Sequence, residues 1–433
     1  MSTTLDTIVP PPLPAATAAT AELRAGAPLP AGIFEEVRRT MLLDCCKWDP
    51  QVGDVAALAP FPLLLSAAAW AFLRDAAERL AAETLAIEHE LLRRPDLHGT
   101  LALPRRLRRL FAAVVDREIA ITPAAARVMR FDFHPTADGW RVSEVNSDVP
   151  GGFTEASAFT AAVARHVPGA VAAGDPAGEL ARSLAAAADA GDVALLCAAG
   201  FMEDQQVVAN LARLLRRLGV TCHLAQPGHL RWRDGCAHLD AAWNCGRLGA
   251  IVRFYQAEWL ANLRGGARAA WQPMFVGGET RVCNPGVAAL SESKRLPLVW
   301  DDLSTPVPAW RRFLPETRAL RDANWRRGSD WLIKTAFCNT GDAVAAADLV
   351  PPKQWRRVRL DALLHPGQWI AQRRFDITPL DTPAGRMFPC VGVYTINGRA
   401  CGIYGRLSPT PVISYSSTDV AVLVEQTGGG EES

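Results

Sequence analysis

Two short segments near residue 140 carry charged and amide side chains at alternate positions, a pattern that could bind a cation. Arg130 and Asp132 alternate in the first segment, and Glu144 and Asn146 alternate in the second. Because successive side chains of a β-strand point to opposite faces, each pair would share one face of its strand. Carboxylate and amide oxygens suit Mg²⁺, which usually takes one or two carboxylates together with phosphate oxygens. An arginine beside them suits an anionic substrate.

A turn between the two segments predicts that they form a hairpin. Pro135 to Gly139 supplies the turn residues, and paired strands on either side would bring both carboxylates, the amide and the guanidinium onto one patch. A charged hairpin face exposed to solvent would explain the same alternation. The stretch that follows, residues 146–152, is polar and ends in Pro-Gly-Gly. Glycine there would let the backbone approach a ligand closely, which favours a binding site.

Composition limits the classes of protein that fit. A chain of 433 residues is long enough for two or three domains, and 49% hydrophobic residues are ample for a buried core. The net charge of +1 gives no case for a nucleic-acid partner. The ten cysteines show no CxxC pair and no zinc spacing, so we expect reduced thiols and a cytoplasmic protein.

A membrane span is not expected either. Residues 55–73 are uncharged, but Pro60 and Pro62 interrupt them, and the helix that follows runs into charged residues. Periodicity predicts that helix over about 61–94, and a second helix over 101–115. Farther on, strands at 192–198 and 220–225 around a helix at 203–218, with a third strand at 250–255, predict a parallel α/β unit.

These elements predict six successive regions. They are a disordered leader (1–32), a helical N-terminal region (33–125), the hairpin region (126–175), the parallel α/β subdomain (176–265), a strand-rich, lysine-bearing subdomain (266–425) and a loose tail (426–433).

The strand-rich subdomain contains basic residues near the expected ends of its elements. Lys294, Lys334 and Arg406 could together bind a polyphosphate, although each alone would more readily be a surface charge. The sequence has no GxxxxGK[ST], no GxGxxG after a strand and no GxSxG. It therefore lacks the P-loop, the dinucleotide-binding fingerprint and the hydrolase elbow.

Taken together, these motifs resemble the glutathionylspermidine synthase family, a circularly permuted branch of the ATP-grasp ligases. RFDF at 130–133 and EVNSD at 144–148 stand where the family has RxDF and EYNAD. The resemblance continues, in family order, through Asn284, Pro285, Lys294, Ile333-Lys334, Gln372 and the sequence GVYTINGRACGIYGR that ends at Arg406. It implies an α/β (α+β) ATP-grasp fold, circularly permuted, with a helical N-terminal region.

The resemblance also implies roles for individual residues. Asp132, Glu144 and Asn146 match the family's Mg²⁺ ligands, and Arg130 matches the residue that holds the acyl substrate. Lys294 and Lys334 match the lysines that contact the ATP phosphates, and Arg406 matches a basic residue near those phosphates. Gln372 lies in the segment that leads to the adenine pocket. Ser147, Asp148 and Glu155 could hold the ammonium group of a substrate, or equally could cap the helix expected over 153–167.

The implied reaction is ATP-dependent amide formation from a small carboxylate and an amine, through an acyl phosphate, with ATP and Mg²⁺. Phosphoryl transfer needs positioning and charge neutralisation, which Arg130 and Arg406 would supply. The family's KPxxGRxG loop is altered here, because its proline is Thr335, its first glycine Cys338 and its arginine Asn339, while Gly341 is kept. This alteration leaves open a second function, a non-catalytic or regulatory nucleotide-binding protein. A third interpretation is an unrelated α/β protein with a chance hairpin.

Overall fold

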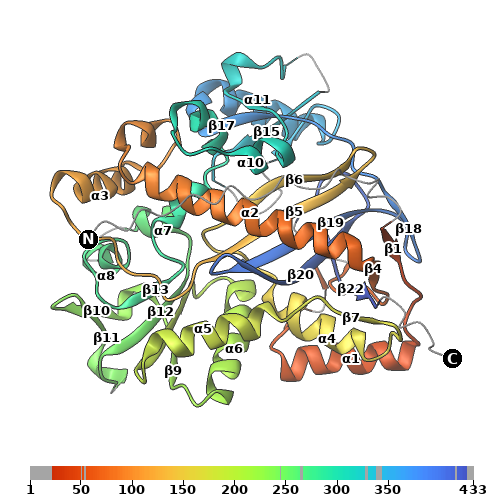
Figure 1. Cartoon of the computed structure of the whole chain (residues 1–433), viewed down its shortest axis with the longest axis horizontal. Helices are drawn as coiled ribbons and strands as arrows, with labels where there is room; N and C mark the ends of the chain where they lie inside the picture. The colour runs from red at the N-terminus through yellow and green to blue at the C-terminus, as the bar shows by residue number, and fades with distance from the viewer. Residues whose placement is uncertain are drawn as a thin grey trace.

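A six-stranded antiparallel sheet occupies the centre of the molecule. In the computed structural model, the described residues are 22–49, 51–52, 55–243, 245–263, 267–326, 330–337, 344–414 and 417–426. The strand order is β21-β20-β19-β5-β6, and β18 pairs with β19 (Figure 1). The strands are β5 (Val128–Thr136), β6 (Gly139–Asn146), β18 (Leu380–Thr382), β19 (Gly385–Ile396), β20 (Arg399–Ser408) and β21 (Thr418–Val420).

The predicted hairpin is confirmed, and its register brings the four polar residues together. Arg130 pairs with Asn146 and Asp132 pairs with Glu144, so all four side chains lie on one face of the sheet. The alternate residues of β5 point the other way into the core, where Phe131 is fully buried. Alternation along β5 therefore divides a polar face from an apolar face.

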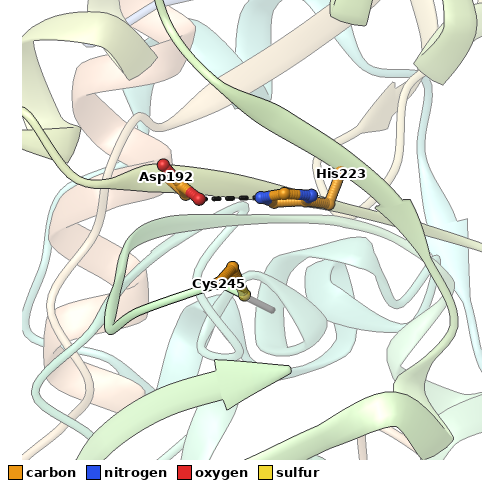
Figure 2. A group of neighbouring side chains, drawn as sticks. All are labelled: Asp192, His223 and Cys245. Carbon is orange, nitrogen blue, oxygen red and sulfur yellow. Dashed lines mark hydrogen bonds and ion pairs between the residues drawn. The ribbon is translucent and has the colours of Figure 1, made fainter. Parts of the chain in front are cut away.

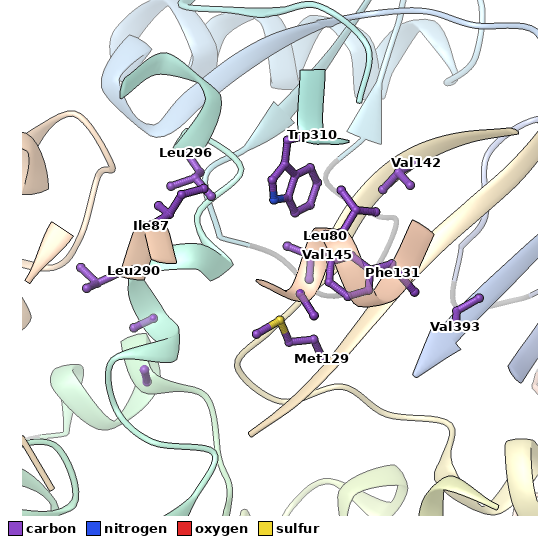
Figure 3. Packing of buried hydrophobic residues seen from close by; sticks show 14 of the residues in the cluster. Leu80, Ile87, Met129, Phe131, Val142, Val145, Leu290, Leu296, Trp310 and Val393 are labelled. Atoms are coloured by element: carbon purple, nitrogen blue, oxygen red, sulfur yellow. The ribbon is translucent and has the colours of Figure 1, made fainter. Parts of the chain in front are cut away.

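A long helix covers the apolar face. Helix α2 (Ala67–Leu91) crosses β19 and β20 (Figure 1). Its residue Leu80 packs near Phe131, and its residue Ile87 packs near Leu290 and Leu296 (Figure 3). The helix begins later than the predicted residue 61. Pro62 cannot donate a backbone hydrogen bond, the next three residues form strand β4 (Leu63–Leu65), and the Ser66 hydroxyl caps the helix by accepting from Ala69 N.

A second sheet joins segments from the two ends of the described chain. Its order is β1-β4-β22-β7, with β1 (Leu23–Ala25), β7 (Ala170–Ala172) and β22 (Val422–Glu425). The prediction of a disordered leader through residue 32 is therefore wrong for its last part. Leu23 is buried, and β1 exchanges backbone hydrogen bonds with β4, which outweighs the local Ala/Pro-rich composition. Residues 1–21 lie outside the described part of the chain.

The parallel α/β unit is confirmed. Its strand order is β13-β12-β8-β9, with β8 (Asp192–Cys197), β9 (Cys222–Ala225), β12 (Leu248–Phe254) and β13 (Arg281–Cys283). Helices α5 (Pro176–Ala188) and α6 (Met202–Arg217) pack on one face, through Leu184 and Leu215 among others (Figure 1). On the other face, Leu196 and Ile251 belong to the same core cluster as α7 (Ala257–Asn262).

A fourth sheet contains the segment that carries Lys334. Its order is β14-β17-β15-β16, with β14 (Thr317–Arg318), β15 (Trp331–Thr335), β16 (Val344–Ala345) and β17 (Trp369–Arg373). The other helices and strands are α1 (Ala31–Asp44), α3 (Arg105–Asp116), α4 (Thr160–Ala164), α8 (Ala267–Trp271), α9 (Ala288–Glu292), α10 (Pro308–Phe313), α11 (Pro352–Leu364), β2 (Gln51–Val52), β3 (Val55–Ala56), β10 (Leu230–Arg233) and β11 (Cys236–Leu239).

In the described residues, no helix combines the length and apolar character that crossing a membrane requires. Apart from the end of the leader, the boundaries of the six predicted regions stay predictions.

Candidate functional site

The carboxylate of Asp132 is the centre of the polar face. Its Oδ1 accepts from Arg130 Nε at 2.7 Å, and its Oδ2 accepts from Arg406 Nη2 at 2.7 Å and from Asn146 Nδ2 at 3.1 Å. The side chain is buried, and burial alone would raise its pKa. The guanidinium groups of Arg130 and Arg406 outweigh burial and hold the pKa of Asp132 well below its usual range, so the group is ionised.

A glycine on the intervening strand makes room for this cluster. Strand β19 lies between β5 and β20, and its residue Gly392 pairs with Asp132. A Cβ atom at Gly392 would lie 2.9 Å from Arg130 Cδ and 3.0 Å from Asp132 Oδ1. The absence of a side chain therefore lets the two charged groups lie over β19. Glycine inside a strand is a known sign of such close approach, but the sequence analysis did not use it.

Glu144 adjoins two lysines from distant segments. Lys294 Nζ lies 3.3 Å from Glu144 Oε2, and Lys334 Nζ donates to Ser143 O at 3.2 Å. Burial raises the pKa of Glu144, but the charges of Lys294 and Lys334 lower it more, and the net shift is downward. Burial lowers the pKa of Lys334 to about 8 despite the nearby Glu144. The structure thus brings together both predicted lysines and a predicted metal ligand.

A cavity of about 840 Å³, counted with its space open to solvent, lies over these groups; we call it the small cavity. Its polar lining includes Asp132, Glu144, Lys294, Lys334, Gln372 and Arg406, and its apolar lining includes Leu332, Leu349, Phe375, Ile377 and Val412. Gln372 Oε1 and Arg406 Nε are buried and have no hydrogen-bond partner among the described residues. Such atoms are available to a polar ligand.

A larger cavity of about 1830 Å³, counted in the same way, includes the predicted residues Arg130 and Asn146 in its lining; we call it the large cavity. Arg130 Nη1 donates to Gly151 O at 2.6 Å, and its guanidinium lies 5.1 Å from the centre of the Tyr404 ring. Arg406 lines both the small and the large cavity. The two cavities therefore meet at one cationic side chain.

The large cavity has an acidic and aromatic wall that the sequence analysis missed. Glu203 and Asp204 lie in the first turn of α6, and Glu258 lies in the first turn of α7. Burial is the first cause of a raised pKa at all three, to about 6 for Asp204 and about 8 for Glu258. Acidic residues at a helix start usually complement the helix dipole, so their sequence position alone gave no signal of a pocket. The aromatic rings of this wall are those of Phe201, Tyr255 and Trp259.

Another acidic cluster in the large cavity surrounds a lysine of the N-terminal region. Lys47 Nζ lies 2.5 Å from Glu155 Oε1, 3.2 Å from Asp49 Oδ1 and 3.3 Å from Asp419 Oδ2. Burial lowers the pKa of Lys47, but the carboxylates raise it more, so the lysine is charged. Burial also raises the pKa of Asp419 to about 6. These contacts join three segments far apart in sequence, around residues 47–49, 155 and 419, which no local motif indicates.

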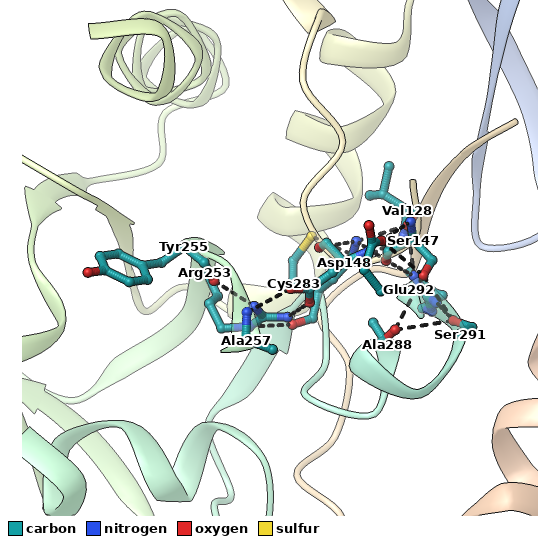
Figure 4. A network of polar contacts seen from close by, with 12 residues as sticks. Val128, Ser147, Asp148, Arg253, Tyr255, Ala257, Cys283, Ala288, Ser291 and Glu292 are labelled. Carbon is teal, nitrogen blue, oxygen red and sulfur yellow. Dashed lines mark hydrogen bonds and ion pairs between the residues drawn. The ribbon is translucent and has the colours of Figure 1, made fainter. Parts of the chain in front are cut away.

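Ser147 and Asp148 do not lie where a substrate could reach them. Asp148 forms a buried ion pair with Arg253 and accepts from Ala257 N at 2.7 Å, and Ser147 N donates to Glu292 Oε2 at 2.7 Å (Figure 4). Neither residue lines the small or the large cavity. The predicted ammonium site at Ser147 and Asp148 is therefore wrong. The alternative that they cap the helix expected from residue 153 is wrong too, because no side chain caps that segment and Asp148 accepts instead from Ala257 N, the first residue of α7. Asp148 therefore fixes the end of β6 to strand β12 of the parallel sheet, and Ser147 fixes it to helix α9.

Two predicted nucleotide-binding residues, Asn339 and Gly341, lie outside the described residues. The loop after Lys334 that contains them stays a prediction.

Comparisons with known proteins agree with this architecture. The family described as glutathionylspermidine synthase preATP-grasp matches residues 63–425. None of the curated proteins matches the chain. A glutathione synthetase-like effector (GSS30) from Globodera pallida, solved in its apo form, has a TM-score of 0.59 at 12% identity, covering 92% of this chain and 98% of its own.

A weaker match is a protein from Methylobacillus flagellatus KT assigned by name as a gamma-glutamylcysteine synthetase, with a TM-score of 0.41 at 12% identity over 78% of this chain and 88% of its own. The family match and the fold of the effector confirm the predicted fold class, a mixed α/β fold of the ATP-grasp type. The chain belongs to the glutathionylspermidine synthase preATP-grasp family.

Proposed function

We propose that this protein is an ATP-dependent carboxylate–amine ligase that forms an amide bond through an acyl phosphate. Membership of a synthetase family supports the ligase class. The observation that carries the proposal is the position of Arg406, which lines both cavities and contacts Asp132. A phosphoryl group passing from a nucleotide in the small cavity to an acid in the large cavity would pass this guanidinium.

The small cavity fits a nucleoside triphosphate. Lys294 and Lys334 supply positive charge for phosphate oxygens, and the apolar side chains offer a surface for a base. The unpartnered Oε1 of Gln372 would accept a hydrogen bond from the amino group of adenine. These contacts are those that an ATP site needs.

A magnesium ion fits the residues present. Asp132, Glu144 and Asn146 offer hard oxygen donors on one face of the sheet. The amide nitrogen of Asn146 donates a hydrogen bond to Asp132, so the amide oxygen of Asn146 is the atom that would bind a cation. When bound, the ion would offset the negative charge of the transferring phosphoryl group. Some of the hydrogen bonds that Arg130 and Arg406 donate to Asp132 would have to break for the ion to bind this carboxylate.

The large cavity supplies the sites for the two substrates. Arg130 would bind the carboxylate of the acid, whose oxygen forms a bond to the γ-phosphorus while the bond to the ADP oxygen breaks beside Arg406. The amine nitrogen then forms a bond to the acyl carbon, phosphate leaves with the C–O electron pair, and the amine releases its proton. The carboxyl groups of Glu203 and Asp204 lie in the wall that would hold a cationic amine before this step.

A non-catalytic nucleotide-binding protein is the second candidate function, and one observation favours it. Both oxygens of Asp132 already accept hydrogen bonds from arginine, and Asn146 also donates to this carboxylate. A chain that only binds nucleotide could keep this closed arrangement. The large cavity beside it, with Arg130 in its lining, favours the ligase instead.

Release of ADP separates the two functions. The protein is incubated with ATP and Mg²⁺ and with panels of small acids and amines, each alone and in pairs. A ligase releases ADP and phosphate in amounts that depend on an acid and an amine together, whereas a binding protein binds ATP in calorimetry and releases neither. Glu144→Gln should abolish the release, while Asp301→Asn, at an exposed surface ion pair, should not.

A further inference from the structure

Three side chains of metal-binding types converge at a place remote from both cavities. The ligand atoms of Asp192, His223 and Cys245 all lie within 4.8 Å of one another (Figure 2). Asp192 is the first residue of β8, whereas Phe201, which lines the large cavity, follows the end of that strand. In a parallel sheet the strand starts and strand ends lie at opposite edges, so this cluster is separate from the proposed ligase site.

The sheet determines how the first two side chains meet. Residue 194 of β8 pairs with His223 of β9, and Asp192 is two residues before it, so Asp192 and His223 share one face of the sheet. Nε2 of His223 and Oδ2 of Asp192 are 2.8 Å apart. Trp243 packs edge-on against His223, with 6.0 Å between the centres of the two rings, and this contact restricts the rotation of the imidazole.

The third side chain comes from the connection between β11 and β12. Cys245 lies shortly before β12 begins at Leu248, and Leu248 pairs with Asp192. The thiol thus reaches the pair from a separate segment. All three side chains are half-buried, so an ion could enter while few water molecules compete for it.

The chemistry of the set selects a class of ion. A thiolate and an imidazole favour borderline-soft ions, and with one carboxylate they match the ligands of Zn²⁺, whereas Mg²⁺ prefers oxygen ligands alone. Tetrahedral Zn²⁺ would hold these atoms roughly 3.3–3.7 Å apart. The Asp192–His223 pair would open slightly and Cys245 would close in, both within the reach of side-chain rotation.

We propose that Asp192, His223 and Cys245 bind one Zn²⁺, with water as the fourth ligand, and that the ion ties the connection before β12 to β8 and β9. The ion would cross-link three segments of this unit, and its binding does not depend on the ligase function proposed above. A hydrogen-bonded Asp–His pair beside an unrelated thiol is the alternative that the experiment must exclude.

The experiment uses the full chain, freed of metal with a chelator and kept in excess Mg²⁺ to occupy oxygen-rich sites. Titration with Zn²⁺ should show one tight site per chain and raise the melting temperature. Co²⁺ in place of Zn²⁺ should give a thiolate-to-cobalt charge-transfer band. Cys245→Ser should weaken Zn²⁺ binding by at least about tenfold and remove the band. Cys236→Ser is the matched control, because Cys236 is a free, half-buried cysteine of the same unit outside the cluster, and it should keep both.

Equal Zn²⁺ affinity in the wild-type protein and in Cys245→Ser, or no charge-transfer band in the wild-type protein, would overturn the proposal. If Cys245→Ser does not fold, Asp192→Asn provides the second test, since asparagine keeps the shape and the hydrogen bond to His223. This variant should unfold at the wild-type temperature without Zn²⁺ and gain less from its addition. An unchanged gain would also contradict the site.

Discussion

Arg406 Nη2 lies 2.7 Å from Asp132 Oδ2, although their strands, β20 and β5, are separated by β19. The contact crosses a whole strand, and it places positive charge where the small and the large cavity meet.

Arg406→Lys should lower the rate of ADP release about 100-fold. Lysine keeps the positive charge, but its ammonium group lacks the planar, forked set of N–H donors with which the guanidinium reaches Asp132. Binding of ATP, held mainly by Lys294 and Lys334, should change little. Steady-state kinetics and calorimetry measure the two effects. Arg399→Lys, at an exposed position at the start of the same strand, should leave both unchanged.

Gly392→Ala should impair the site more than the fold. The new methyl group would push against Arg130 and Asp132, whose side chains can move, and no backbone atom is among its nearest neighbours. We expect a lower turnover rate and a higher KM for the acid, with an unfolding midpoint near that of the wild type. Gly367→Ala adds its methyl group in open space and is the control. A fully active Gly392→Ala protein would show that the position of Arg130 over β19 does not matter.

Glu258→Gln should make the stability of the protein depend less on pH. Burial raises the pKa of Glu258 to about 8, above its ordinary value near 4.5. A raised pKa in the folded state contributes stability that is complete below pH 4.5 and is lost as the pH rises through 8. The variant lacks this loss, so it should be more stable than the wild type at pH 8.5, by on the order of 2 kcal/mol, and similar at pH 5. Denaturant unfolding at both pH values tests this; equal stability at pH 8.5 counts against a protonated Glu258.

Lys47→Met should destabilise the fold by about 3 kcal/mol at pH 7, because it leaves Glu155, Asp49 and Asp419 buried together without a cation. Adding Glu155→Gln to the variant should recover part of the loss, since one of the repelling charges is then gone. Chemical unfolding of the single and double variants measures both effects. Lys353→Met, on the exposed surface of α11, should be neutral, and an equal loss there would point to a general effect of removing lysine.

The polar hairpin could be predicted from the sequence because its information is local. Alternation along residues 130–134 and 143–146 and the turn between them determine which side chains share a face. The parallel α/β unit was predictable for the same reason, because each of its strands is bounded by clear turn residues.

The rest of the site depends on contacts between distant segments. Lys47 meets Asp419, and the wall of Glu203 and Glu258 joins the starts of two helices, and neither arrangement leaves a local pattern. Strand β1 was missed because its burial comes from pairing with β4, against its own composition. Ser147 and Asp148 were misassigned because polar type alone does not distinguish a ligand contact from a buried structural bond.

The sheet β1-β4-β22-β7 also constrains how the protein is made. Strand β22 lies between β4 and β7, with β4 parallel to it and β7 antiparallel. During translation, β1, β4 and β7 leave the ribosome long before β22 is synthesised, and until then β4 and β7 have unpaired edges. The nascent N-terminal region must wait in an incomplete state that a chaperone could recognise, and a stop codon before residue 422 would leave it permanently open.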